Sequence, residues 1–190
     1  MKNFWAVVQK ELRSYFYSPF IYLMTAVFLL LSGWYFYSDL IFYAQFGFGM
    51  NILENFWQLL FTDLRLVILF FIPFMTMRLF AEEKRLGTIE LLFTYPKRDS
   101  EIFWGKFLAC ALAVLFMLSW TVLYVVIVYA LQPFDWTVVL AGYTGLILLA
   151  LSFIACGLFI SSLTDNIVVA GSGALGVVLF FWILSWNDGA

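Results

Sequence analysis

Residues 77–106 read MRLFAEEKRLGTIELLFTYPKRDSEIFWGK, and they form the one long charged segment of a chain that is otherwise almost continuously apolar. Long apolar runs flank this segment on both sides. It holds six of the ten basic residues and five of the twelve acidic residues of the chain. We therefore expect a loop that leaves the membrane on the cytoplasmic side and meets a soluble partner there.

The composition of the whole chain is that of a membrane protein. Of its 190 residues 65% are hydrophobic and 12% are charged, and the mean hydropathy is +0.98. A soluble domain carries roughly 25% charged residues, so this chain has too little polar surface to coat a globule in water. The net charge of −2 gives no sign of a nucleic-acid partner. No signal peptide is expected, because the first apolar run is too long for one.

Few residues of the chain could carry chemistry. It contains no histidine, which excludes histidine-based metal sites, catalytic triads and proton relays. Cys110 and Cys156 lie within apolar runs without metal-ligand spacing, so we interpret them as buried thiols. No Walker lysine motif, HExxH, GxSxG or pair of intramembrane carboxylates is present. We predict no catalytic, cofactor-binding or metal-binding residue, so that any energy used must come from another subunit.

The apolar runs predict an all-α, polytopic membrane protein. A helix needs about 20 apolar residues to cross a hydrocarbon core of ~30 Å. Five runs are candidate spans: residues 20–42, 64–80, 103–131, 137–160 and 167–186. Between the first two we expect an outer loop, residues 43–62, with a short amphipathic segment near 52–60. Pro73 predicts a kink in the second run, and Asp63 and Arg65 are interpreted as snorkelling anchors at its outer end.

Residues 3–16 form an amphipathic segment before the first span. Its apolar side chains share one helical face: Phe4, Val7, Val8, Leu12 and Tyr15. Because Lys10 and Arg13 lie off this face, we predict a helix in the membrane interface, with its apolar side in lipid and its cations at the headgroups. The alternative is a simple extension of the first span. Ser18-Pro19 favours a break, since the residue before a proline is pushed out of helical geometry.

The distribution of lysine and arginine predicts the orientation. Basic residues precede the first span and recur in residues 81–102, whereas residues 43–62 and 132–136 have none. We therefore expect the N-terminus and the 81–102 loop in the cytoplasm. The turn at 161–166 is then cytoplasmic as well, where Asp165 can cap the next helix, and the C-terminus lies outside.

Gly171, Gly173 and Gly176 spell GxGxxG inside the last apolar run. A dinucleotide-binding fingerprint needs a preceding strand and a βαβ context, which is absent here. Small residues four apart in a membrane helix let two helix backbones approach. We interpret these glycines as helix-packing residues.

A short amphipathic helix is predicted within the charged segment, at residues 88–95. Thr88 can cap it, and Glu90 in its first turn is favoured by the helix dipole. Ile89, Leu92 and Phe93 then share one face, and Pro96 ends the helix. Such a helix can insert its apolar face into a groove on a soluble protein. The alternative is that it lies flat on the membrane.

Residues 77–96 closely resemble the signature of ABC-2 type transporter permeases, in which an acidic pair is followed by Gly-Thr, an acid, leucines and a proline. Further matches are Lys10-Glu11-Leu12 with Ser18-Pro19, Gly105-Lys106-Phe107, and Leu163-Thr164-Asp165-Asn166. The resemblance therefore runs along nearly the whole chain. Within the family, the chain resembles the gliding-motility-associated or copper-enzyme-maturation type of subunit.

The resemblance implies a single ABC-2 type transmembrane domain over residues 1–190. It implies a multi-pass permease half in the inner membrane that pairs with a second half, as a homodimer or heterodimer, and with a cytoplasmic ABC ATPase that binds the ATP. Residues 3–16 would be the connecting helix and 88–95 the coupling helix. The implied ATPase-coupling interface is Glu82, Glu83, Lys84, Arg85, Gly87, Thr88, Ile89, Glu90, Leu92, Phe93 and Pro96. Six spans are usual in the family, so we expect either that a sixth is missing from this sequence or that the chain is a fragment.

Three functional hypotheses follow. The first is a permease that exports or flips a substrate. The second is a membrane anchor or mechanical transducer of an ATPase-driven assembly, such as gliding motility or secretion, without solute transport. The third, an intramembrane enzyme, is disfavoured because no nucleophile, base or metal constellation is visible.

Overall fold

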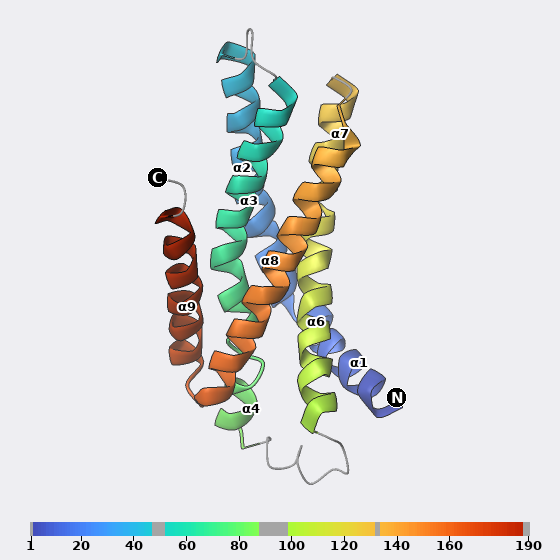
Figure 1. Ribbon diagram of the computed structural model, residues 1–190. Helices are drawn as coiled ribbons and strands as arrows, with labels where there is room; N and C mark the ends of the chain where they lie inside the picture. The colour runs from blue at the N-terminus through green and yellow to red at the C-terminus, as the bar shows by residue number, and fades with distance from the viewer. Residues whose placement is uncertain (1, 47–51, 88–98, 132–133, 188–190) are drawn as a thin grey trace.

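A computed structural model describes residues 2–46, 52–87, 99–131 and 134–187. Within these ranges the chain is almost entirely helical and contains no strand (Figure 1). Its helices are α1 (Lys2–Tyr17), α2 (Pro19–Phe46), α3 (Ile52–Thr76), α4 (Ala81–Arg85), α6 (Asp99–Ser119), α7 (Val122–Leu131), α8 (Trp136–Leu163) and α9 (Ile167–Asn187).

The predicted fold class, an all-α polytopic membrane protein, is confirmed. In the described ranges five segments are long and apolar enough to cross a membrane. They are Pro19–Gln45, Phe56–Arg85, Ser100–Leu131, Trp136–Leu163 and Ile167–Leu184.

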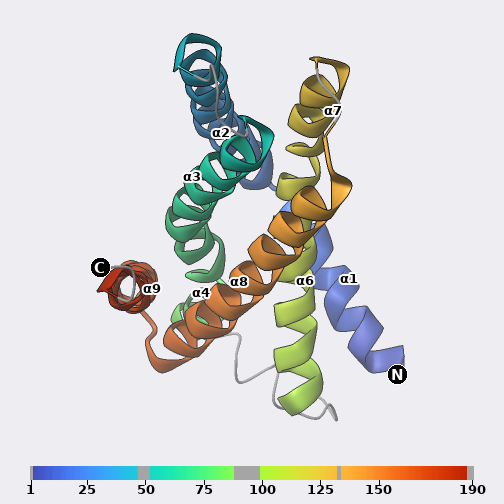
Figure 2. The same ribbon diagram turned by 45° about the horizontal axis from the view of Figure 1, so that its top comes forward.

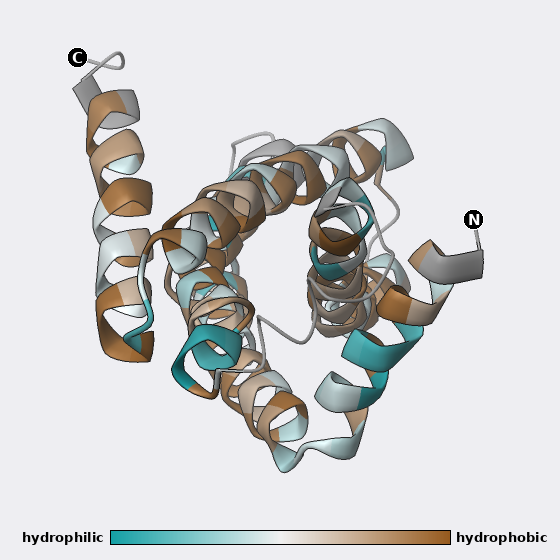
Figure 3. Ribbon diagram, turned by 90° about the horizontal axis from the view of Figure 1, so that it is seen from below, coloured by the Kyte–Doolittle hydropathy of each residue, from teal (hydrophilic) through white to brown (hydrophobic). Residues whose placement is uncertain are grey.

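Helix α3 forms the centre of the bundle. It packs against α2, α8 and α9, and it is the most buried of the five spans. Helix α8 crosses the bundle diagonally between the α7 end and the α4 end (Figures 1 and 2). Helix α9 lies at one side, against α8 and α3, and is the least buried span (Figure 3).

The bounds predicted for the outer loop, residues 43–62, are wrong, whereas the amphipathic segment predicted near 52–60 is helical. Helix α2 continues to Phe46 and α3 already begins at Ile52, so the amphipathic segment near 52–60 is the first part of α3. Phe56, Trp57 and Leu60 are buried on one face of α3, where the ring of Trp57 lies 4.9 Å from that of Phe134. This aromatic packing extends the helix beyond the purely apolar run.

Two polar residues of the second span consequently lie further from the start of their helix than predicted. Asp63 and Arg65 are about three helical turns inside α3, not at its outer end. Pro73 is within α3, whose regular part ends three residues later at Thr76. A turn then leads to α4, a short helix within the predicted 81–102 loop.

The third span is interrupted rather than continuous. The α6 helix ends at Ser119 and α7 begins at Val122. At the break the Thr121 hydroxyl donates to the Leu118 carbonyl at 2.7 Å and lies 2.9 Å from the Tyr143 hydroxyl of α8. These bonds satisfy the polar atoms of a turn that lies within an apolar segment.

The predicted cap of the last span is one residue off. The side chain of Asn166, not Asp165, accepts the hydrogen bond from the Val168 amide, at 3.0 Å. An asparagine is as effective a helix cap as an aspartate.

The predicted break at Ser18-Pro19 is confirmed, because α1 ends at Tyr17 and α2 begins at Pro19. The environment expected for the apolar face of α1 is wrong. Val7 and Val8 are buried, and α1 packs chiefly against α6 rather than exposing this face to lipid. Gly105 of α6 permits the close approach, since a Cβ there would lie only 2.7 Å from Cγ1 of Val7.

Candidate functional site

Most of the charged residues of the described chain lie at one end of the bundle. Helix α4, the N-terminal halves of α1 and α6 and the last turn of α8 all lie at the lower end in Figure 1. Viewed from that end, the hydrophilic parts of α1 and α4 stand out from the apolar spans (Figure 3). Helix α4 ends and α6 begins at this end of the bundle.

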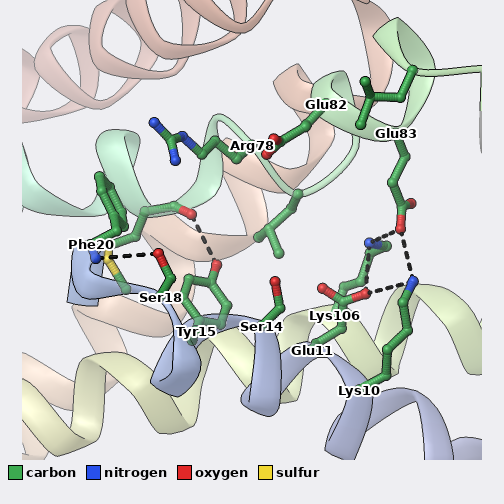
Figure 4. A pocket seen from close by; sticks show the side chains of 13 residues that line it. Lys10, Glu11, Ser14, Tyr15, Ser18, Phe20, Arg78, Glu82, Glu83 and Lys106 are labelled. Atoms are coloured by element: carbon green, nitrogen blue, oxygen red, sulfur yellow. Dashed lines mark hydrogen bonds and ion pairs between the residues drawn. The ribbon is translucent and has the colours of Figure 1, made fainter.

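Four residues at this end form an ionic cluster, which we define as Lys10, Glu11, Glu83 and Lys106. The Lys106 Nζ lies 3.1 Å from Glu11 Oε1 and 3.0 Å from Glu83 Oε1. Lys10 contacts the same two oxygens, at 3.6 Å on Glu11 and 3.3 Å on Glu83. The cluster therefore connects α1, α4 and α6, which are far apart in sequence (Figure 4).

Lys106 is the buried centre of the ionic cluster. Only 1% of its surface is exposed, and the ring of Phe80 lies 5.3 Å from its Nζ. A buried ammonium group is tolerated when carboxylates pair with it, as Glu11 and Glu83 do. Lys10 is mostly exposed and adds a more weakly held partner.

Hydrogen bonds to α8 fix the entry to α4. The Ser161 hydroxyl accepts from the amides of Phe80 and Ala81, at 3.1 and 3.2 Å, and donates to the Met77 carbonyl at 3.2 Å. Lys84 donates to the Ser162 carbonyl at 2.5 Å. The end of α8 thus satisfies backbone groups in the turn before α4.

The predicted ATPase-coupling residues fall into two groups, those with side-chain bonds inside the chain and those without them among the described residues. Glu83 and Lys84 are directed to contacts within the chain, whereas Glu82 is half-buried and Arg85 is exposed. Gly87 has a φ of +67°, a left-handed conformation suited to glycine, directly before residue 88. Thr88, Ile89, Glu90, Leu92, Phe93 and Pro96 lie outside the described residues. The interface itself therefore stays a prediction.

Tyr15 attaches α1 to the end of α3. Its hydroxyl donates to the Met75 carbonyl at 3.0 Å. Burial raises the pKa of this phenol well above its ordinary value of 10.0, and the neighbouring Cys110 raises it further. The hydroxyl therefore stays protonated and remains a donor at any physiological pH.

A pocket of about 420 Å³ lies between α1, the start of α2, the end of α3 and α4. The ionic cluster occupies one end of it, and Phe20 and Arg78 lie at the other (Figure 4). The Arg78 guanidinium lies over the Phe20 ring, 4.6 Å from its centroid, in a cation–π contact. Glu82 lines the same pocket.

The three glycines predicted to pack helices differ in their surroundings. A Cβ at Gly171 would lie 3.1 Å from Met77 Sδ, and one at Gly173 would lie 2.9 Å from Ile160 Cγ2. A Cβ at Gly176 would meet nothing within 4 Å. Ala170, directly before Gly171, and Ala174, directly after Gly173, are fully buried. A packing role for Gly176 stays a prediction.

Sequence reasoning missed the ionic cluster and the Ser161 contacts. One signal was present: a lysine placed within an apolar run, as Lys106 is, needs a partner if the helix is in a membrane. The partners of Lys106 could not be identified from the sequence, because Glu11 and Glu83 are far from it along the chain. Among the described residues no group of three or more histidine, cysteine or acidic side chains could hold a metal ion.

Comparisons with known proteins give one match. A family model described as ABC-2 family transporter protein matches residues 5–187. Searches of curated proteins and of solved structures give no significant match.

Proposed function

Since this chain belongs to the ABC-2 transporter family, we propose that it moves a substrate across the inner membrane with energy from ATP hydrolysed by a separate cytoplasmic subunit. The chain is a permease component of an ABC transporter, with five apolar helical segments in its described part. Members of this family are typically non-catalytic membrane subunits that associate with an ABC ATPase. In our proposal this chain binds no ATP itself and works with a second permease half.

The observation that carries the proposal is the ionic cluster. It attaches α4, which directly precedes the predicted coupling helix, to α1 and α6 through the carboxylate of Glu83. Ser161 attaches the same turn to α8. If the ATPase displaced residues 88–95, the movement would therefore be transmitted through α4 to α6, α8 and α1, in addition to the covalent connection of the loop. This is the physical requirement for coupling through one cytoplasmic segment.

The orientation in this proposal has the ionic cluster on the cytoplasmic side. Nine of the ten basic residues of the chain either precede the first span or lie in residues 77–106. By the positive-inside rule, this distribution supports a cytoplasmic N-terminus and a cytoplasmic α4.

The docking role is tested on the predicted coupling helix. The triple substitution Ile89→Asp, Leu92→Asp and Phe93→Asp should abolish co-purification of the ATPase while leaving membrane insertion intact. Gln9→Asp, an exposed site on α1, is the matched control and should keep the ATPase bound. Unchanged co-purification of the triple variant would refute the docking role.

A second candidate function is a membrane anchor or mechanical transducer that uses the partner ATPase without moving a solute. The described spans support this second function, because they carry few charged side chains that could bind a polar solute. Uptake of labelled substrates by reconstituted vesicles separates the two functions. ATP-driven conformational change without any translocated molecule would sink the transport proposal.

A further inference from the structure

The pocket beside the ionic cluster has the dimensions of a small-molecule site. Its volume of about 420 Å³ lies within the roughly 300–1,000 Å³ typical of ligand pockets. Five polar side chains besides the cluster line it, Ser14, Tyr15, Ser18, Arg78 and Glu82, and Phe20 forms an aromatic wall. The lining residues come from α1, the start of α2, the end of α3 and the turn after it, α4 and α6.

Two opposite charges in this pocket have no ionic partner in the described part of the chain. The carboxylates of Glu11 and Glu83 are paired with Lys10 and Lys106. By contrast, among the described residues no ion pair within 4.0 Å involves Arg78 or Glu82. The Arg78 guanidinium rests on the Phe20 ring, which leaves its N–H donors available to a ligand.

An exposed apolar stripe runs from this pocket along α2. Leu23, Val27 and Leu31 follow Phe20 at i+3, i+7 and i+11, so they lie on one side of the helix. Their exposed fractions are 62%, 41% and 44%. In a membrane this stripe faces hydrocarbon, so a lipid headgroup in the pocket would have a path for its acyl chain along α2.

We propose that the pocket binds the phosphoethanolamine headgroup of a membrane phospholipid. Arg78 donates its planar fork of N–H groups to the phosphate, and Glu82 accepts from the primary ammonium. Ser14 supplies a further hydroxyl. The proposal requires only that the chain spans a membrane and is independent of the ATPase partner.

The charge balance of the pocket selects this headgroup over others. Three cations line it, Lys10, Arg78 and Lys106, and so do three carboxylates, Glu11, Glu82 and Glu83. A lining with no net charge favours a zwitterion over an anionic headgroup such as phosphoglycerol. A choline headgroup is also zwitterionic, but its quaternary ammonium has no N–H to donate to Glu82.

The test is retention of lipid by the purified full chain. Native mass spectrometry of protein exchanged into detergent with equal amounts of phosphatidylethanolamine, phosphatidylglycerol and phosphatidylcholine should show preferential retention of the first. Arg78→Ala should lower the apparent affinity for phosphatidylethanolamine about tenfold or more, because a hydrogen bond to a charged group is lost. Glu82→Gln should abolish the preference over phosphatidylcholine while keeping phosphate binding.

Arg13→Ala, which removes an exposed arginine of α1 outside the pocket, is the control and should bind as the unmodified chain does. Arg78→Lys keeps the charge but not the planar fork of N–H groups, so this variant should bind phosphatidylethanolamine more weakly than the unmodified chain and more tightly than Arg78→Ala. If Arg78→Ala does not fold, Arg78→Lys and Glu82→Gln test the proposal. The proposal is overturned if retention does not distinguish the three lipids, or if Arg78→Ala and Arg13→Ala behave alike. It is also overturned if Arg78→Ala reduces only ATPase binding, since the pocket would then belong to the ATPase interface.

Discussion

Lys106 illustrates how a single charge can be held inside an apolar segment. Its side chain is 2% exposed, and its Nζ lies within 3.1 Å of two carboxylate oxygens from different helices. Pairing of this kind offsets the desolvation of the charges more than it adds net stability. Removing one partner of the pair is much more costly than the pair is stabilising, because the remaining charges stay buried without compensation.

We predict that Lys106→Met destabilises the chain by roughly 3–5 kcal/mol, the usual cost of removing one partner from a buried pair. Lys10→Met is the matched control: its ammonium contacts the same two oxygens, but its side chain is 60% exposed, so the loss should be about 0–1 kcal/mol. Thermal unfolding in detergent measures both. Adding Glu11→Gln and Glu83→Gln to Lys106→Met should restore part of the loss. Equal effects of the two lysine substitutions would contradict the central place of Lys106.

Asp135 gives a pH-dependent prediction at the start of α8. Its side chain accepts from the Thr137 amide at 2.9 Å, and this bond lowers its pKa below the ordinary value of 3.8. A carboxyl whose pKa is lowered by folding contributes stability above its unfolded pKa, and the contribution is lost as pH falls through the folded pKa. Asp135→Ala should therefore lower the melting temperature at neutral pH, with a difference from the unmodified chain that shrinks below about pH 3.8.

The control for this cap is Asp135→Asn, which keeps an acceptor without a titrating group. It should melt close to the unmodified chain at neutral pH and show no such loss on acidification. A difference between Asp135→Ala and the unmodified chain that is constant down to pH 3 would show that the cap does not titrate as proposed.

At the scale of elements, α8 approaches α3 closely because Gly157 of α8 has no side chain. A Cβ at Gly157 would lie 2.7 Å from Cβ of Thr76. Thr76 cannot easily move away, because its hydroxyl donates to the Ile72 carbonyl at 3.0 Å. The contact therefore depends on backbone proximity rather than on the area of a large side chain.

We predict that Gly157→Ala costs about 1–3 kcal/mol by overpacking this contact. Gly145→Ala on the same helix is the control, since a Cβ there would meet nothing within 4 Å. That control should be neutral or slightly stabilising through helix propensity, by up to ~1 kcal/mol. Urea unfolding in mixed micelles distinguishes them, and an equally mild effect of Gly157→Ala would mean that α8 can shift away from α3.

The spans were predictable from the sequence as elements, because membrane crossing requires long apolar helices and the chain has few other apolar stretches. Their limits were less predictable. Glu54, Asp63 and Arg65 lower the hydropathy of the α3 sequence, yet the helix continues because Phe56 and Trp57 pack on one face. Hydropathy reports what lipid tolerates, whereas the end of a helix depends on packing and capping.

At the scale of the whole molecule, the candidate site depends on three positions far apart in sequence. The charged segment itself was visible, and its place at one end of the bundle followed from the flanking spans. The ion pairs joining residues 11, 83 and 106 were not predictable, because they depend on how α1 packs against α6. That packing in turn depends on Gly105, which sequence alone does not distinguish from other membrane glycines.

The orientation of the whole molecule can be tested by labelling single cysteines. Nine of the ten basic residues lie before the first span or in residues 77–106, and the positive-inside rule predicts that such segments lie on the cytoplasmic side. In a background with Cys110→Ala and Cys156→Ala, we predict that an impermeant maleimide labels Thr137→Cys in intact cells. Arg85→Cys should react only after permeabilisation. Both positions are exposed, and Thr137→Cys keeps the backbone amide that Asp135 accepts, so reactivity reports sidedness rather than burial. Labelling of Arg85→Cys from outside, with Thr137→Cys protected, would invert the topology and remove α4 from the reach of a cytoplasmic ATPase.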